Sequence, residues 1–115
     1  MVLVFTHPDC AKHVTPPGHP ERVDRLAAVE RGLAGIPAER RECPMGEEAE
    51  VLRCHPATYL ARVKAAVPVE GWAQLDPDTF LSPGSFDAAM RAVGGISAAV
   101  DAVVTGKAKT AFVAG

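Results

Sequence analysis

Two aspartates flank a proline at Asp76, Pro77 and Asp78, and their type and spacing suggest chemistry. Carboxylates two residues apart can bind a metal ion or accept hydrogen bonds from the backbone amides of a substrate. Aspartate is also common in tight turns, because its side chain accepts a hydrogen bond from a nearby backbone N–H group. The sequence leaves both interpretations open.

A second set of reactive side chains lies in the long segment after the first apolar run. It contains three histidines and a cysteine, and such nitrogen and sulfur ligands can bind zinc. Their spacing matches no standard zinc finger and prolines separate them, so we interpret them as structural or solvent-facing residues. His19 differs from the rest because it directly precedes a predicted helix, where it can orient the loop so that Arg25 reaches inward. The four residues are His7, Cys10, His13 and His19.

The elements that must position these residues follow from apolar patterning. Short β-branched and aromatic runs at Val2–Phe5 and Thr110–Ala114 predict buried strands of a parallel sheet. Strands separated by helices predict an α/β fold, in which chemistry lies at the carboxyl ends of the strands. Between these runs we expect helices from Pro20 to Gly35, within Glu47–Arg53, from Pro56 to Val67 and from Ser85 to Gly106, and a short strand around Arg41–Cys43.

The Ser85–Gly106 helix has the clearest boundaries. Ser85 is a predicted N-cap, Asp87 suits the positive end of the helix dipole, and Gly106 suits a left-handed C-terminal cap. One stripe of the helix is apolar. Gly94 and Gly95 lie in its middle, where each costs about 1 kcal/mol relative to alanine. We therefore expect another part of the backbone to approach the helix closely at this point.

Composition restricts the classes of protein to consider. A chain of 115 residues, 48% of them apolar, corresponds to one domain or part of one. The formal net charge of −2 provides no basic field for nucleic acid or for an anionic membrane surface, and no segment predicts a membrane span. Three cysteines at scattered spacings argue against a disulfide framework and favour a reducing cytoplasm.

Three ordered segments resemble one family. Gly18–Leu26 (GHPERVDRL), Val51–Leu60 (VLRCHPATYL) and Leu75–Gly95 are similar to the N-terminal part of the histone deacetylase and acetylpolyamine amidohydrolase family. The resemblance implies an arginase-like fold, here a partial three-layer α/β/α arrangement with a parallel sheet. Residues 1–115 would then be the N-terminal part of a single catalytic domain. It also implies zinc-dependent hydrolysis of acetyl-lysine or acetylated polyamines.

The resemblance assigns roles to three positions. Asp78 resembles the rim aspartate that holds the backbone or amine groups of the substrate, and Arg25 resembles an arginine that lines the internal channel near the acetate pocket. His19 belongs to the motif that shapes this loop. Val23 departs from the pattern, because many family members have proline there.

In the family, a strand like Thr110–Ala114 leads into an Arg-Pro-Pro-Gly-His-His stretch, and the zinc ligands and the transition-state tyrosine come later. None of these lies within residues 1–115. We therefore expect this chain alone to contain no catalytic residue or metal ligand, to hold no zinc, and to self-associate through an exposed sheet edge. The alternative is a self-contained, non-catalytic α/β binding module with a structural metal on its first-loop cysteine and histidines. The DNA after the Gly115 codon would separate the two.

Overall fold

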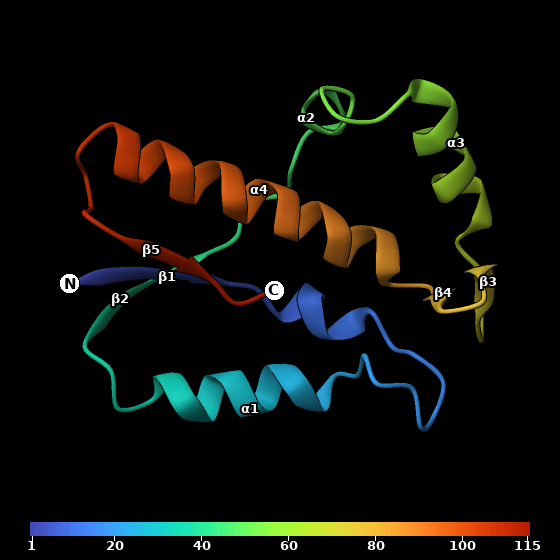
Figure 1. The fold of residues 1–115 in the computed structure, drawn as a ribbon, viewed down its shortest axis with the longest axis horizontal. Coiled ribbons are helices and arrows are strands. Elements are labelled where there is room, and N and C mark those ends of the chain that lie inside the picture. The colour runs from blue at the N-terminus through green and yellow to red at the C-terminus, as the bar shows by residue number, and fades with distance from the viewer.

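A three-stranded parallel sheet forms the centre of the molecule. The computed structural model describes all 115 residues, and its sheet has the order β2–β1–β5 (Figure 1). Both apolar runs form strands, as predicted. The strand that was expected around Arg41–Cys43 is β2, which lies at the edge of the sheet; it begins earlier and ends before Cys43. The strands are β1 (Val2–Thr6), β2 (Ala38–Glu42) and β5 (Ala111–Val113), with Val4 opposite Arg40 in β2 and Phe112 in β5.

Helices cover both faces of this sheet. Figure 1 shows α1 (Asp24–Leu33) on one side of the strands and α4 (Ser85–Val104) on the other. The chain leaves β1 for β2 on one side and later returns to β5 on the other side of β1. Because crossovers between parallel strands are right-handed, these opposite directions place the two helices on opposite faces. The predicted three-layer α/β fold with a parallel sheet is confirmed.

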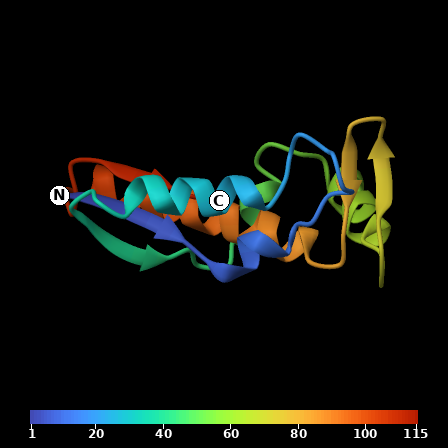
Figure 2. The same ribbon diagram turned by 90° about the horizontal axis from the view of Figure 1, so that it is seen from below.

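The connections contain elements that the sequence did not predict. An antiparallel hairpin projects from one end of the molecule (Figure 2). A 3₁₀ helix occupies part of the first loop, which was expected to be irregular. His7 caps this helix through Nδ1, which accepts a hydrogen bond from Asp9 N–H (3.0 Å), and Pro8 suits its first turn. The connecting elements are η1 (Pro8–Lys12), α2 (Glu48–Val51), α3 (Ala57–Ala66), β3 (Ala73–Asp76) and β4 (Thr79–Leu81).

Helix α1 starts four residues later than predicted, at Asp24 rather than Pro20. Side chains of the preceding loop bind the backbone of Glu21 instead. Its N–H donates to His19 Nδ1 (3.1 Å), and its carbonyl accepts a hydrogen bond from the hydroxyl of Thr15. The Thr15 hydroxyl thus occupies a carbonyl that would otherwise accept a helical N–H, and His19 satisfies an N–H that would have no acceptor in a first helical turn.

The N-terminal end of α4 differs from the prediction, and its C-terminal end agrees with it. Ser85 is the first helical residue rather than the N-cap, which is Gly84. The Ser85 hydroxyl instead accepts the backbone N–H of Ser82 (2.7 Å). At the other end Gly106 has φ +79°, and its N–H donates to the Val103 carbonyl (3.2 Å). Lys107 N–H reaches the Ala102 carbonyl (2.9 Å), which completes a Schellman cap.

The paired glycines make the close approach that was predicted. A Cβ atom on Gly94 would lie 2.0 Å from the carbonyl oxygen of Pro44. A Cβ on Gly95 would lie 2.6 Å from Cys43 Sγ and 3.2 Å from Val113 Cγ1. All three distances are shorter than van der Waals contact, so only glycine fits. The adjoining core consists of Leu3, Phe5, Cys43, Ala99 and Ala102.

The larger apolar residues of α4 point away from the sheet. Phe86, Met90 and Val93 line an apolar groove of about 350 Å³ beneath α2 and α3. The stripe continues for three further turns without a cover; we call Ile96, Val100, Val103 and Val104 the outer apolar stripe, and all four are exposed. None of the helices combines the length and apolar character needed to cross a bilayer.

Candidate functional site

The two aspartates at the hairpin tip have different environments. Asp76 accepts the backbone N–H of Asp78 at Oδ1 (2.9 Å), as in an aspartate-stabilised turn. The Asp78 amide, and then the Thr79 side chain, hold the pKa of Asp76 below its usual value, because they stabilise the charged carboxylate. Asp76 therefore has a structural role in the turn.

Asp78 has a fixed backbone and a free side chain. Its N–H is held by Asp76, and its carbonyl accepts a hydrogen bond from His19 Nε2 (3.0 Å). The residue is exposed, and its carboxylate accepts no hydrogen bond and forms no ion pair within the chain. A positioned carboxylate with all its lone pairs available can accept N–H groups from a ligand.

His19 connects the first loop to the hairpin. Its Nδ1 accepts the N–H of Glu21 while its Nε2 contacts the Asp78 carbonyl, so both bonds together require the Nε2–H tautomer. The ring also meets Phe80 edge to face, with 5.5 Å between ring centroids and an interplanar angle of 82°. The structure thus brings His19 and Asp78 together, although 59 positions separate them.

Arg25 lies apart from this pair as an exposed residue at the edge of a cavity of about 280 Å³. Its Nη2 donates to the Gly115 carbonyl (3.0 Å). Gly115 follows β5 and Cys10 follows β1, so the cavity opens at the carboxyl ends of adjacent parallel strands, where open α/β sheets bind ligands. Its other lining residues are Cys10, His13, Glu21, Leu81, Ser85 and three alanines.

A hydrogen-bond network between the first loop and α4 was not predicted. His13 Nδ1 lies 2.6 Å from Ser85 Oγ, and His13 Nε2 lies 3.5 Å from a carboxylate oxygen of Glu21. Ser82 Oγ accepts the Val14 N–H (3.0 Å) and donates to the Lys12 carbonyl (3.0 Å). The only sequence signal was the group of serines before the long helix, and it did not indicate a partner 72 residues away.

An ion pair supports this arrangement on the neighbouring side. Asp9 of η1 accepts a hydrogen bond from Arg91 Nε on α4 (3.0 Å) and pairs with Lys12 (2.7 Å). Lys12 first, and Arg91 second, lower the pKa of Asp9, since both favour the ionised form. Arg91 also donates to the Cys43 carbonyl (3.1 Å), so it joins η1, α4 and the end of β2.

The residues present do not fit a zinc site. Nowhere do three histidine, cysteine, aspartate or glutamate side chains converge around one position. His7, His13 and His19 each bind a different partner, as described above. Cys10 is buried, and burial raises the pKa of its thiol, which disfavours the thiolate that metals require.

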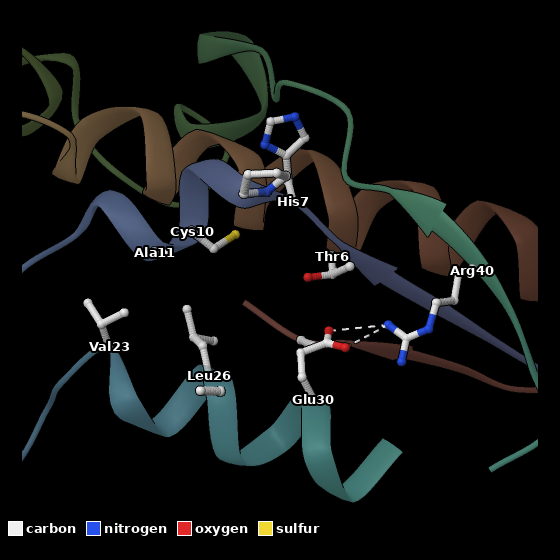
Figure 3. Close-up of a pocket in the computed structure, with 11 residues that line it drawn as sticks. Thr6, His7, Cys10, Ala11, Val23, Leu26, Glu30 and Arg40 are labelled. Atoms are coloured by element: carbon white, nitrogen blue, oxygen red, sulfur yellow. Dashed lines mark hydrogen bonds and ion pairs between the residues drawn. The ribbon is translucent and has the colours of Figure 1, made fainter. Parts of the chain in front are cut away.

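A cavity of about 450 Å³ separates α1 from η1 (Figure 3). Val23, the N-cap of α1, and Leu26 of α1 face Cys10 and Ala11 across it, and the lining is mainly apolar. The Glu30 carboxylate at its edge is neutralised by Arg40 (3.0 Å). This cavity holds no unpaired charge, so the cavity at Arg25 is the better candidate for polar chemistry.

Comparisons with known proteins identify the relatives of this chain. Residues 18–115 match the sequence profile of the histone deacetylase domain. A histone deacetylase-like amidohydrolase of Pseudomonas aeruginosa is 34% identical over 105 residues, and an uncharacterised protein of Synechocystis sp. is 33% identical over 100 residues. The crystal structure of the HDA15 HD domain has the same fold, with a TM-score of 0.87 at 21% identity.

These matches cover most of this chain but only part of each relative. They span 91% of this chain and 27% of the Pseudomonas protein, and 81% and 33% for the Synechocystis protein. The HDA15 match covers 99% of this chain and 35% of that structure. The chain therefore corresponds to about a quarter to a third of the length of its relatives.

Proposed function

Because the chain belongs to the histone deacetylase domain family, we propose that its residues form the substrate rim and the inner channel wall of a deacetylase. The enzyme would be zinc-dependent and would hydrolyse acetyl-lysine or acetylated polyamine amides. The three unpaired cysteines favour the reducing cytoplasm as its compartment.

The free carboxylate of Asp78 is the observation that carries this proposal. Hydrogen bonds with Asp76 and His19 fix the backbone of Asp78 and leave its side chain unpaired. A carboxylate in that state can accept the backbone N–H groups or the ammonium group of an acetylated amine. His19 positions this carboxylate by holding the carbonyl of the same residue.

Arg25 would serve the inner end of the site. Its guanidinium faces a small cavity whose alanines leave room for an acetyl group or an acetate ion. A guanidinium binds a carboxylate strongly because its N–H groups form charge-assisted hydrogen bonds. We therefore propose that Arg25 lines the internal channel near the acetate pocket.

The chemistry itself requires groups that these residues do not supply. Zinc, when bound in such an enzyme, polarises the amide carbonyl and activates water. Purified residues 1–115 should therefore hold no stoichiometric zinc and should not turn over acetyl-lysine. Metal analysis and a deacetylation assay check this expectation, and one tightly bound zinc with turnover would contradict it.

A chimaera tests the proposed rim directly. Residues 1–115 would replace the matching segment of the Pseudomonas relative, and deacetylation of an acetyl-lysine peptide would be measured. We expect an active chimaera in which Asp78→Asn lowers kcat/KM by about tenfold to a hundredfold, mainly through KM, because a charge-assisted hydrogen bond is lost.

The matched control is Asp101→Asn, since Asp101 is an exposed aspartate on α4. It should leave kcat/KM unchanged. A folded but inactive chimaera, or equal kcat/KM for the two variants, would contradict the proposal.

A further inference from the structure

The first loop contains the sequence His-Pro-acid twice, as His7–Asp9 and as His19–Glu21. In both copies Nδ1 of the histidine accepts the N–H of the acidic residue two positions later (3.0 Å and 3.1 Å). The copies differ at the second ring nitrogen. Nε2 of His7 forms no hydrogen bond within the chain, whereas Nε2 of His19 holds the Asp78 carbonyl in the β3–β4 hairpin (3.0 Å). The first copy is thus a local turn, and the second joins two distant segments.

The two bonds of His19 require a neutral ring. We call them the His19 latch: Glu21 N–H donates to Nδ1, and Nε2–H donates to the Asp78 carbonyl. A protonated ring carries a hydrogen on both nitrogens, so Nδ1–H would point at the Glu21 N–H across 3.1 Å. Two donors cannot form a hydrogen bond with each other, so the ring must turn away from Glu21. Because the same rigid ring carries Nε2, this rotation also moves Nε2 away from the Asp78 carbonyl.

A protonated His19 has other partners nearby. Glu21 and Asp78 carry carboxylates on the same residues whose backbones the neutral ring binds. Protonation therefore exchanges the two backbone bonds for attraction to a carboxylate. The other charged groups on the segments that contact the ring already have partners. Asp76 accepts the Asp78 N–H, Arg22 lies 4.0 Å from Asp24, and His13 lies 3.5 Å from the Glu21 carboxylate.

We propose that the His19 latch is a pH-sensitive device that fixes the hairpin tip only while His19 is neutral. Histidine titrates between about pH 5 and pH 8, so the latch is closed at the upper end of this range and open at the lower end. The effect on substrate binding rests on the proposed function, because it requires that Asp78 holds the substrate. The latch itself does not rest on it, since both of its bonds join segments of this chain.

NMR of the ¹⁵N-labelled 115-residue chain from about pH 8 to about pH 5 tests the latch without any substrate. At the upper end the His19 ring nitrogens should show the Nε2–H tautomer. As the pH falls, the heteronuclear NOEs of the Asp78 and Phe80 amides should fall with the same midpoint as the His19 ring titration, because the tip becomes mobile. A neutral ring in the Nδ1–H tautomer, a ring that stays neutral throughout, or NOEs that do not follow its titration would overturn the proposal.

Two substitutions separate the two bonds of the latch. His19→Asn keeps an acceptor for the Glu21 N–H, and His19→Gln keeps a donor in the place of Nε2. Neither side chain titrates in this range, so both variants should abolish the pH-dependent fall of the NOE at Asp78. His7→Asn is the matched control, because it makes the same change in the copy that does not contact the hairpin, and it should leave the fall intact. An unchanged fall in either His19 variant, or its loss in His7→Asn, would contradict the latch.

The active chimaera links the latch to substrate binding. Between about pH 8 and about pH 5, KM for the acetyl-lysine peptide should rise about fivefold more than in its His19→Gln variant, which is the effect of one hydrogen bond. If the latch opens in the NMR experiment but KM has the same pH dependence in both proteins, the proposed role of Asp78 is wrong and the latch stands. If Asp78→Asn raises KM but the NOEs do not follow His19, the latch is wrong and the proposed function stands.

Discussion

The sheet-facing side of α4 and the tip of the β3–β4 hairpin fix their backbones in opposite ways. Gly94 touches the backbone of Pro44, and Gly95 touches the side chains of Cys43 and Val113, so neither position has room for a Cβ atom. At the hairpin tip, the Asp78 N–H donates to Asp76 and the Asp78 carbonyl accepts from His19, which holds the backbone and leaves the carboxylate free. Close packing thus provides stability in one region, and in the other hydrogen bonds position a side chain for a ligand.

The largest expected effect is a loss of stability at the packed region. Gly94→Ala should lower the free energy of unfolding by at least about 3 kcal/mol, because the Pro44 carbonyl cannot move away from a Cβ atom without disrupting its neighbours. Urea denaturation followed by circular dichroism measures this loss.

Gly32→Ala is the matched control, since a Cβ atom on Gly32 of α1 would meet no atom within 4 Å. Alanine favours the helix at both positions, so Gly32→Ala should stabilise the protein by about 0.5–1 kcal/mol. Equal effects of the two variants would show that packing against Pro44 does not matter.

A smaller effect is expected from the ion pair between η1 and α4. The pKa of Asp9 is lower in the folded chain than its ordinary value of 3.8. Ionised Asp9 therefore stabilises the fold fully at pH values above the ordinary pKa, and this stabilisation is lost as pH falls through the lowered pKa of the folded chain. Asp9→Asn should reduce stability at neutral pH and flatten the stability profile in this acidic range.

Denaturation measured from pH 2 to pH 7 checks this prediction for Asp9. The neutral-pH stability of Asp9→Asn should also lose part of its salt dependence. An unchanged acid slope in this variant would mean that other carboxylates control acid unfolding.

The smallest effects should separate the two aspartates of the hairpin. Asp76→Asn should speed amide exchange in β3 and β4, because the turn loses a charged acceptor, whereas Asp78→Asn should not. Hydrogen exchange followed by NMR measures both. If exchange rises equally in the two variants, Asp78 is a structural residue like Asp76.

Local patterns in the sequence predicted β1, β5, the Gly106 cap and the close approach at the paired glycines. The strands and the cap depend on neighbouring residues, and glycine inside a helix is costly unless close packing requires it. They did not predict the pairing of His13 with Ser85 or of His19 with Asp78, whose partners are distant in the chain. The hairpin was missed because β3 and β4 are short and β3, with the sequence AQLD, has no β-branched or aromatic residue. The sequence also could not rank Asp76 against Asp78, since their difference lies in their hydrogen bonds.

An NMR titration of the ¹⁵N-labelled chain with an acetyl-lysine peptide tests the role of Asp78 most directly. We expect saturable shift changes in the amides of Asp78, Thr79 and Phe80, with a dissociation constant of about 1 mM because only part of the site is present. These changes should vanish in Asp78→Asn and persist in Asp101→Asn. Equal titration of the two variants, or no shift at the hairpin tip, would contradict the assignment of Asp78 as the substrate-binding carboxylate.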